Sequence, residues 1–112
     1  MHDAHQDDGV TFINVIEIPT EQVEAFVEGW RRRADLMSAM PGFRGYRLHR
    51  ALSGESRFQL VNVSYWDSAE AFRAATANPR FQEGIRALEA DARLQVTAHP
   101  ALYQVVVSDD LD

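Results

Sequence analysis

The fold is decided by residues 57–70, which run RFQLVNVSYW and then DSAE. Residues 57–66 are rich in β-branched and aromatic side chains and therefore predict a strand. The next four residues, Asp67 to Glu70, have the form of a capping box. They predict a helix that begins directly after the strand and continues to about residue 77.

Two strands and one helix are predicted upstream of this stretch. Residues 11–18, TFINVIEI, end at Pro19 and predict the first strand, and residues 43–51 predict the second. A glycine-containing hairpin loop, residues 52–56, joins the second strand to the third. Thr20 is a candidate N-cap for a helix between the first two strands, which Pro41-Gly42 ends. Its apolar residues recur at helical spacing: Val23, Phe26, Val27, Trp30, Ala34 and Met37.

The chain downstream of the second helix supplies another helix and a last strand. Pro79 behind Asn78 predicts a helix to about residue 92, and residues 101–107, ALYQVVV, predict the fourth strand. The order β-α-β-β-α-β, with the second helix broken in two, is the split βαβ arrangement of a ferredoxin-like α+β fold with a four-stranded antiparallel sheet. We expect this domain to cover residues 10–107, between a flexible tail at 1–9 and an acidic tail at 108–112.

One face of the predicted sheet has no covering element. Helices cover the other face, whereas Val61, Val63 and Tyr65 of the third strand point away from them. A lone monomer would leave this apolar surface in contact with water. We therefore expect a homodimer in which two sheets pack face to face, forming a dimeric α/β barrel.

Composition excludes several classes of function. The 112 residues carry a formal net charge of −6, which argues against a nucleic-acid binder. The chain has no cysteine, so disulfides and thiolate chemistry are excluded. No apolar run is long enough to span a membrane and the first residues do not form a signal peptide, so a cytoplasmic location is expected.

Common catalytic and metal-binding signatures are missing from the sequence. It contains no Gly-rich phosphate loop, nucleophile elbow or His-Glu-x-x-His motif. Of its four histidines, His2 and His5 lie in the expected tail, while His49 and His99 have no acidic residue at metal-ligand spacing. We expect neither a protein-bound metal nor another cofactor.

Asn14 and Asn62 are unusual because each interrupts an apolar strand face. By alternation, Asn14 shares the helix-facing side of the sheet with Phe12, and Asn62 shares it with Phe58 and Trp66. Buried amides need hydrogen-bond partners, so each asparagine either satisfies an irregular backbone or belongs to a polar patch between sheet and helices. Two amides beside a tryptophan favour the patch.

The arginines of the helices allow a structural and a functional interpretation. Arg31, Arg32 and Arg33 are expected on the solvated side of the first helix, with Trp30 in the core. Arg86 follows the apolar stripe of the third helix, where it either pairs with Glu83 or Glu89 at the surface or reaches an anionic ligand.

Several stretches, in this order and at these intervals, resemble the antibiotic biosynthesis monooxygenase family over about residues 10–107. They are Val10-Thr11-Phe12-Ile13-Asn14, Pro41-Gly42-Phe43, Val61-Asn62-Val63-Ser64-Tyr65-Trp66 and Ala71-Phe72-Arg73. Within the family, the chain is most similar to cofactor-independent anthrone oxygenases of aromatic polyketide pathways. These carry a first-strand Asn and a third-strand Asn-x-x-x-Trp, which Asn14, Asn62 and Trp66 match.

The resemblance implies that O2 oxidises an electron-rich phenol, of the anthrone or hydroquinone type, to a quinone without metal or flavin. Asn14 and Asn62 would donate hydrogen bonds to a developing phenolate, and Trp66 would stack on the flat substrate and assist through its indole N–H. The expected substrate-binding residues are Phe12, Phe58, Phe72 and Arg86. Some anthrone oxygenases carry a tyrosine where this chain has Phe72, so a phenolic proton donor is not expected there.

Two alternatives remain open at the level of sequence. The heme-degrading branch of the family shares the first-strand Asn and the third-strand Trp, but it needs an axial histidine on the helical segment after the Trp. Residues 68–92 contain no histidine, so His49 or His99 would have to reach the iron. The second alternative is a non-catalytic small-molecule-binding domain, because a fold alone does not fix an activity.

Overall fold

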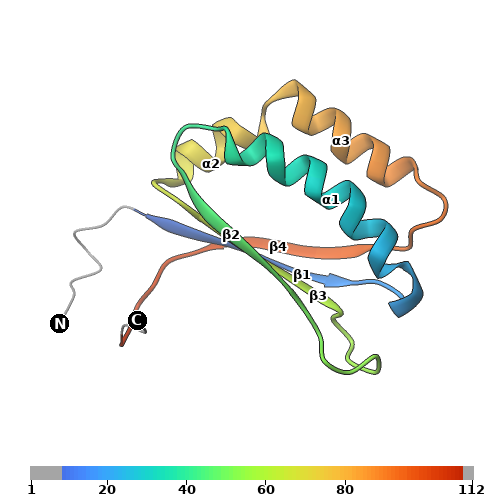
Figure 1. Ribbon diagram of the computed structural model, residues 1–112. Helices are drawn as coiled ribbons and strands as arrows, with labels where there is room; N and C mark the ends of the chain where they lie inside the picture. Colours follow the sequence, from blue (N-terminus) through green and yellow to red (C-terminus); the bar gives the residue numbers. More distant parts are fainter. Residues whose placement is uncertain (1–8, 110–112) are drawn as a thin grey trace.

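The structure is a computed structural model that describes residues 9–109 (Figure 1). The expected tails fall mostly outside this range, and so do His2 and His5. The chain runs β1 (Val10–Glu17), α1 (Val23–Ser38), β2 (Phe43–Arg50), β3 (Leu60–Trp66), α2 (Ala69–Thr76), α3 (Pro79–Ala90) and β4 (Thr97–Tyr103). The four strands form one sheet in the order β2-β3-β1-β4, and each neighbouring pair is antiparallel. The predicted ferredoxin-like α+β fold is confirmed.

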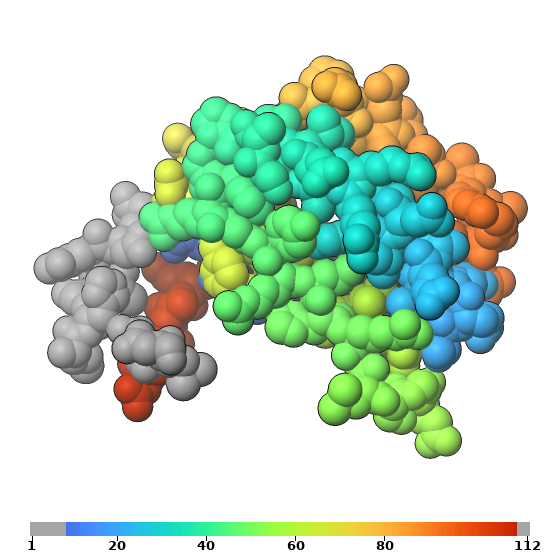
Figure 2. Space-filling view, in the orientation of Figure 1, coloured from blue at the N-terminus to red at the C-terminus, as the bar shows by residue number. Residues whose placement is uncertain are grey.

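The molecule has two layers, a twisted sheet and a layer of helices. All three helices lie on the same face of the sheet, and no described helix or strand lies on the other face (Figure 1). The loop between β2 and β3 projects away from the body of the molecule (Figure 2). Within residues 9–109, no helix combines the length and apolar character needed to cross a bilayer.

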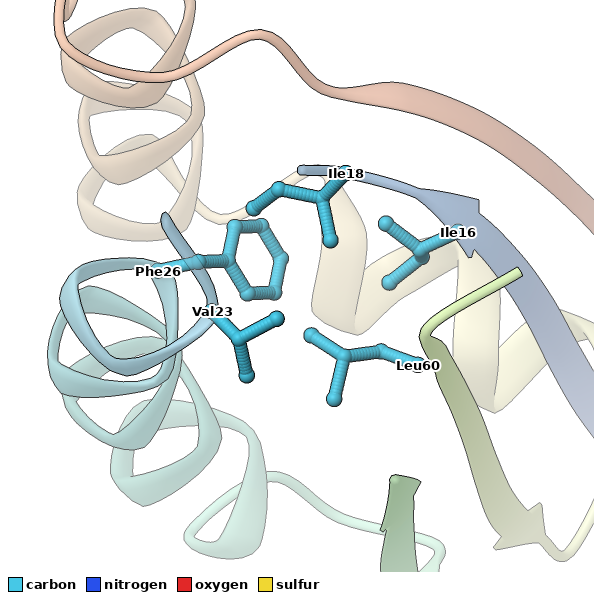
Figure 3. Packing of buried hydrophobic residues seen from close by; sticks show 5 residues of the cluster. All are labelled: Ile16, Ile18, Val23, Phe26 and Leu60. Atoms are coloured by element: carbon cyan, nitrogen blue, oxygen red, sulfur yellow. The ribbon is translucent and has the colours of Figure 1, made fainter. Parts of the chain in front are cut away.

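A small apolar core joins one end of α1 to the sheet. Val23 and Phe26 of α1 point toward Ile16 and Ile18 of the first strand region and Leu60 of β3 (Figure 3). Each of these five side chains is at most 6% exposed. Because the hydrophobic effect scales with the apolar area removed from water, this cluster fixes where α1 crosses the sheet.

The first helix begins differently from the prediction. Thr20 is not its N-cap, since residues Thr20–Gln22 form a 3-10 turn and α1 follows from Val23 without a side-chain cap. The Thr20 hydroxyl instead donates to the Gly54 carbonyl, 3.2 Å away in the β2–β3 loop. This bond links two loops far apart in sequence rather than satisfying the helix end.

The second helix begins one residue later than a capping box requires. Ser68, not Asp67, is the N-cap, and its hydroxyl accepts the Ala71 N–H at 3.1 Å. Asp67 is bound by Arg44 of β2, whose Nε lies 2.6 Å from Oδ1 of Asp67. The predicted cap of α3 is confirmed, because Asn78 accepts the Arg80 N–H immediately before Pro79.

The fourth strand lies four residues earlier than predicted. It spans Thr97–Tyr103 and therefore contains Pro100, whereas the apolar run Val105 to Val107 follows it and is exposed. A proline cannot donate to a sheet, but β4 is an edge strand with only β1 beside it, where proline is tolerated. The apolar run was therefore a misleading guide to the strand.

The third strand is also shorter than predicted, because residues 57–59 belong to the preceding loop. Gln59 organises this loop with a side chain that is only 3% exposed. Its amide donates to the carbonyls of Ser53 and Ser56, at 3.0 and 2.8 Å. Burial of Gln59 interrupts the alternation of sides that the sequence suggested for this segment.

Candidate active site

A cavity of about 900 Å³ lies between the sheet and the helices. Its volume is in the range of small-molecule sites, and most of its wall is apolar or aromatic. The polar side chains in the wall are Asn14, Arg33, Tyr46, Asn62, Ser64, Thr76 and Glu89. The expected pocket on the helix side of the sheet is therefore present.

Asn14 and Asn62 lie side by side on the sheet wall of this cavity. They are direct partners in the antiparallel register of β1 and β3, so their side chains project from the same face. Both strands are internal in the sheet, and backbone hydrogen bonds therefore hold the two amides in place. The structure brings together the two asparagines that the sequence analysis singled out.

The two amides differ in their partners. Oδ1 of Asn14 accepts the backbone N–H of His99 at 3.1 Å, next to Pro100, which has no N–H of its own. Asn14 thus has a structural role in attaching the edge strand β4. This bond uses only the oxygen of the amide, so the NH2 group can donate to a ligand in the cavity.

Asn62 has no such structural role. Its Oδ1 is buried and has no hydrogen-bond partner within the described structure. A buried polar atom without a partner costs about 1–3 kcal/mol, so such atoms are rare unless a ligand or a water completes them. A strand that needed only stability would carry valine here, and the Asn62 oxygen is left for a donor from a water or a ligand in the cavity.

Trp66 forms one end of the cavity and is only 1% exposed. Its ring meets those of Phe43 and Phe72 edge to face, with centroids 5.2 and 5.5 Å apart. Its indole N–H donates to the Ser64 hydroxyl at 3.0 Å. The N–H expected to assist the reaction is therefore already engaged, and Trp66 contributes its aromatic surface.

Phe12 and Phe72 are both in the cavity wall, as expected. Their rings stack with centroids 4.6 Å apart, which holds α2 against β1. Trp30 of α1 and Tyr46 of β2 also line the cavity, and their rings meet edge to face with centroids 4.9 Å apart. Tyr46 has no distinctive signal in the sequence, because a partly exposed tyrosine on an edge strand fits no particular pattern.

Phe58 and Arg86 are not part of the cavity wall. The Phe58 ring contacts the ring of His99, whose partner Val15 points away from the helices. The expectation that Phe58 faces the helices is wrong, because the buried Gln59 breaks the alternation before β3 begins. Arg86 is exposed on α3, and no ion pair joins it to Glu83 or Glu89 in the described structure.

Arg33 also differs from its prediction. It is only 9% exposed and lines the cavity, whereas Arg31 and Arg32 are exposed as expected. Burial lowers the pKa of the Arg33 guanidinium from its ordinary value, because desolvation disfavours the charged form. The sequence does not distinguish Arg33 from Arg31 and Arg32, because the three are identical and only the rotation of the helix decides which of them faces inward.

Neither of the two histidines that the structure describes supplies an iron ligand to the cavity. His49 and His99 pair with Val61 and Val15, so both project from the open face of the sheet. His99 there lies 2.9 Å from Glu17, and the pKa of that carboxyl is lowered by hydrogen bonds from Arg57 and from His99. Among residues 9–109, no three His, Asp or Glu side chains are grouped to hold a metal ion. Residues 9–109 therefore do not supply a histidine ligand for a heme in this cavity.

Comparison with known proteins agrees with this arrangement of strands and helices. Residues 9–87 match the model of the antibiotic biosynthesis monooxygenase family. The chain belongs to this family. SnoaB, a cofactor-independent oxygenase from Streptomyces nogalater, is a similar solved structure with 30% identity and a TM-score of 0.73. The alignment covers 90% of this chain and 96% of SnoaB.

Proteins that act on or bind porphyrins are similar too. A mycobilin-producing heme oxygenase of Mycobacterium tuberculosis is 36% identical over 70 residues, which are 62% of this chain and 65% of that enzyme. The match therefore spans slightly less than two thirds of this relative. A mutant of MhuD, solved with two manganese protoporphyrin IX molecules per active site, is 27% identical with a TM-score of 0.64. That alignment covers 90% of this chain and 98% of MhuD.

Proposed function

We propose that this protein is a cofactor-independent monooxygenase that uses O2 to oxidise a phenolic substrate of the anthrone or hydroquinone type to a quinone. The observation that carries the proposal is the pair Asn14–Asn62 in an apolar cavity, with the Asn62 oxygen buried and unpartnered. Membership of a monooxygenase family and similarity to SnoaB support it. A polyketide intermediate is the natural source of such a substrate.

The amides act on the oxygen of the substrate. The NH2 group of Asn14, whose oxygen is held by His99, donates to the phenol oxygen and stabilises its anion. Electrostatic stabilisation of this kind is stronger in an apolar cavity than in water. The anion is the electron-rich form that transfers an electron to O2, which starts the reaction.

The chemistry balances without a further reductant. One electron from the substrate anion reduces O2 to superoxide, and recombination of the two radicals forms a carbon–oxygen bond. The resulting peroxide loses water, so one oxygen atom becomes the new carbonyl and the other leaves as water. The aromatic wall of Phe12, Phe72 and Trp66 fits a flat ring system throughout these steps.

Oxygen uptake with anthrone or a dihydroxynaphthalene tests the proposal. We expect the parent protein to consume one O2 per quinone formed. The Asn14→Ala variant, which loses the amide, and the Trp66→Leu variant, which loses the aromatic surface, should be slower by at least about tenfold. Asn78→Ser is the matched control, because Asn78 lies outside the cavity and serine retains the helix cap. Equal rates in all four proteins would reject the assignment of the site.

A heme-degrading activity is the second candidate, since the similar heme oxygenase and the MhuD structure that holds a metalloporphyrin favour it. The cavity argues against it, because neither His49 nor His99 lies in its wall. A heme bound here would need an axial ligand other than these two histidines. The cofactor-independent oxygenase therefore agrees better with the side chains present.

We also propose that the protein works as a homodimer through the open face of the sheet. This face carries Ile13, Val15, Val61 and Val63 at half-buried positions, with the exposed Tyr65 and Tyr103 beside them. The segment after β4 adds Val106 and Val107, which are 86 and 87% exposed. A second copy packed on this face would remove both apolar surfaces from water.

A further inference from the structure

We propose that the Ser64 hydroxyl is a further catalytic group of the cavity, which donates a hydrogen bond to the peroxide formed when O2 joins the substrate. This inference rests on the proposed function and assigns the oxygen side of the same site. Ser64 lies in β3 between Asn62 and Trp66, and all three side chains project from the helix-facing side of the sheet. In the proposed reaction the Asn14 amide binds the phenol oxygen, so the peroxide needs a donor of its own.

The first argument is that Ser64 places a polar group where stability alone would favour an apolar one. It is only 6% exposed and belongs to an internal strand, where β-branched and aromatic side chains are preferred. It lines the cavity together with Phe12 and Tyr46, its register partners on the two neighbouring strands. The hydroxyl is therefore held by three strands at the wall of an otherwise mostly apolar cavity.

The second argument concerns the proton of this hydroxyl. The indole N–H of Trp66 donates to Oγ of Ser64 at 3.0 Å, which uses an acceptor position of the hydroxyl and leaves its own O–H to donate. Within residues 9–109 this O–H has no acceptor. A hydroxyl that accepts a hydrogen bond is a stronger donor than a free one, because the two bonds polarise each other. The indole thus acts on the cavity through Ser64.

The third argument is that the unpaired acceptor of the site lies beside this unpaired donor. Oδ1 of Asn62 is buried without a partner, two residues from Ser64 on the same face of β3, about 6–7 Å along the strand. A group that accepts one hydrogen bond and donates another would satisfy both side chains. A hydroperoxide does so, whereas a phenolate can only accept. The pair therefore suits the oxygen side of the reaction better than the phenolate side.

The chemistry of this step balances with Ser64 unchanged. The carbon-bound peroxide anion takes up the proton that the phenol released at the start, which gives a hydroperoxide. The O–O bond then breaks as the remaining proton on the same carbon leaves, so that a carbonyl and one water form. Ser64 keeps its own proton throughout. Its hydrogen bond stabilises the negative charge on the outer peroxide oxygen, first in the anion and then in the departing hydroxide.

The test is a double-mutant cycle between Ser64 and Trp66, measured as oxygen uptake with anthrone. If Ser64 served only to accept the indole N–H, Ser64→Ala would be harmless once Trp66→Phe had removed that N–H. We expect instead that Ser64→Ala lowers kcat at least about tenfold in the Trp66→Phe background, with KM within about twofold. Phenylalanine retains an aromatic surface, and no buried indole donor is left unpaired there, so this comparison does not depend on the fold of the single Ser64→Ala variant.

A second readout separates the oxygen side from the phenol side. Because Ser64 acts on the peroxide, Ser64→Ala should raise the hydrogen peroxide released per O2 consumed, whereas Asn14→Ala should slow the reaction without raising this ratio. Ser38→Ala is the matched control and should behave as the parent, because Ser38 lies in α1 outside the cavity wall. An unchanged kcat or an unchanged peroxide ratio for Ser64→Ala in the Trp66→Phe background would overturn this inference and leave the proposed function intact. A parent protein that forms no quinone would overturn both.

Discussion

Two neighbouring asparagines occupy equivalent positions in the sheet and yet have different partners. Asn14 accepts the His99 N–H, whereas the Asn62 oxygen is buried without a donor. An Asn62→Val substitution removes the unpartnered oxygen from an internal strand, so we expect the free energy of unfolding to rise by about 1 kcal/mol. Oxygen uptake should fall by at least about tenfold. Urea unfolding and an oxygen electrode measure the two effects.

Asn14→Val is the matched comparison for this prediction. It deletes the acceptor of the His99 N–H, and we expect it to lower the free energy of unfolding by about 0.5–1.5 kcal/mol. The two valine variants should therefore shift stability in opposite directions while both lose activity. Destabilisation by Asn62→Val equal to that by Asn14→Val would show that Asn62 has a structural role instead.

At the residue scale, the sequence predicted the residues on the sheet side of the cavity better than those on its helix side. Strand alternation placed Phe12, Asn14 and Asn62 on the correct face because their strands are regular there. It misplaced Phe58, because alternation has no meaning in the loop around the buried Gln59. It also missed Arg33, because helix periodicity alone does not distinguish an inward cation from one that extends to solvent.

At the scale of elements, the start of α2 depends on one side chain. Ser68 is the N-cap and accepts the Ala71 N–H. The predicted capping box, with Asp67 as cap and Glu70 as its partner, therefore begins one residue too early. We expect Ser68→Ala to lower the free energy of unfolding by about 1 kcal/mol, whereas Glu70→Ala should change it by less than about 0.5 kcal/mol. Urea unfolding measures both. A larger loss of stability from Glu70→Ala than from Ser68→Ala would instead support the predicted capping box.

The turn between α1 and β2 depends on a glycine for two reasons. Gly42 has a φ of +85°, and a Cβ there would lie 2.6 Å from the Ala71 Cβ. Gly45 also has a positive φ, of +147°, but open space surrounds it. We therefore expect Gly42→Ala to lower the thermal unfolding temperature more than Gly45→Ala does, since only the first adds a clash to backbone strain. Equal shifts in calorimetry would contradict the packing argument.

The elements themselves were predictable where several local signals agreed. Asn78-Pro79 located the start of α3 because the cap and the first-turn proline act within three residues. β4 was misplaced because its position depends on pairing with β1, a long-range contact that hydrophobicity along the chain does not encode. Pro100 would argue against a strand in most contexts, and only the edge position makes it acceptable.

At the scale of the whole molecule, the type of oxygenase can be tested with hemin. Because no histidine of the described residues lines the cavity, we expect titration of the parent protein to leave the hemin Soret band unshifted. An Ile85→His variant is the positive control, since Ile85 faces the cavity from α3. A red-shifted Soret band with the parent would favour heme chemistry instead.

The open face of the sheet leads to a prediction about assembly. We expect the parent to sediment as a dimer of the 12.7 kDa chain, and Val63→Glu to sediment as a monomer. A charge in the centre of an apolar interface is costly, whereas Ala74→Glu on the exposed side of α2 should leave the dimer intact. Sedimentation velocity distinguishes these states. A monomeric parent would contradict the proposed assembly.

Both edge strands of the sheet, β2 and β4, carry features that oppose aggregation by strand addition. Pro100 interrupts the row of N–H groups along β4, and the pairing register of β2 shifts between Phe43 and Gly45 at the opposite edge. An unprotected edge strand recruits further strands and seeds fibrils. With both edges disrupted, copies of this chain are hindered from adding strand to strand, so the proposed dimer through the broad face would close on itself instead of growing into a filament.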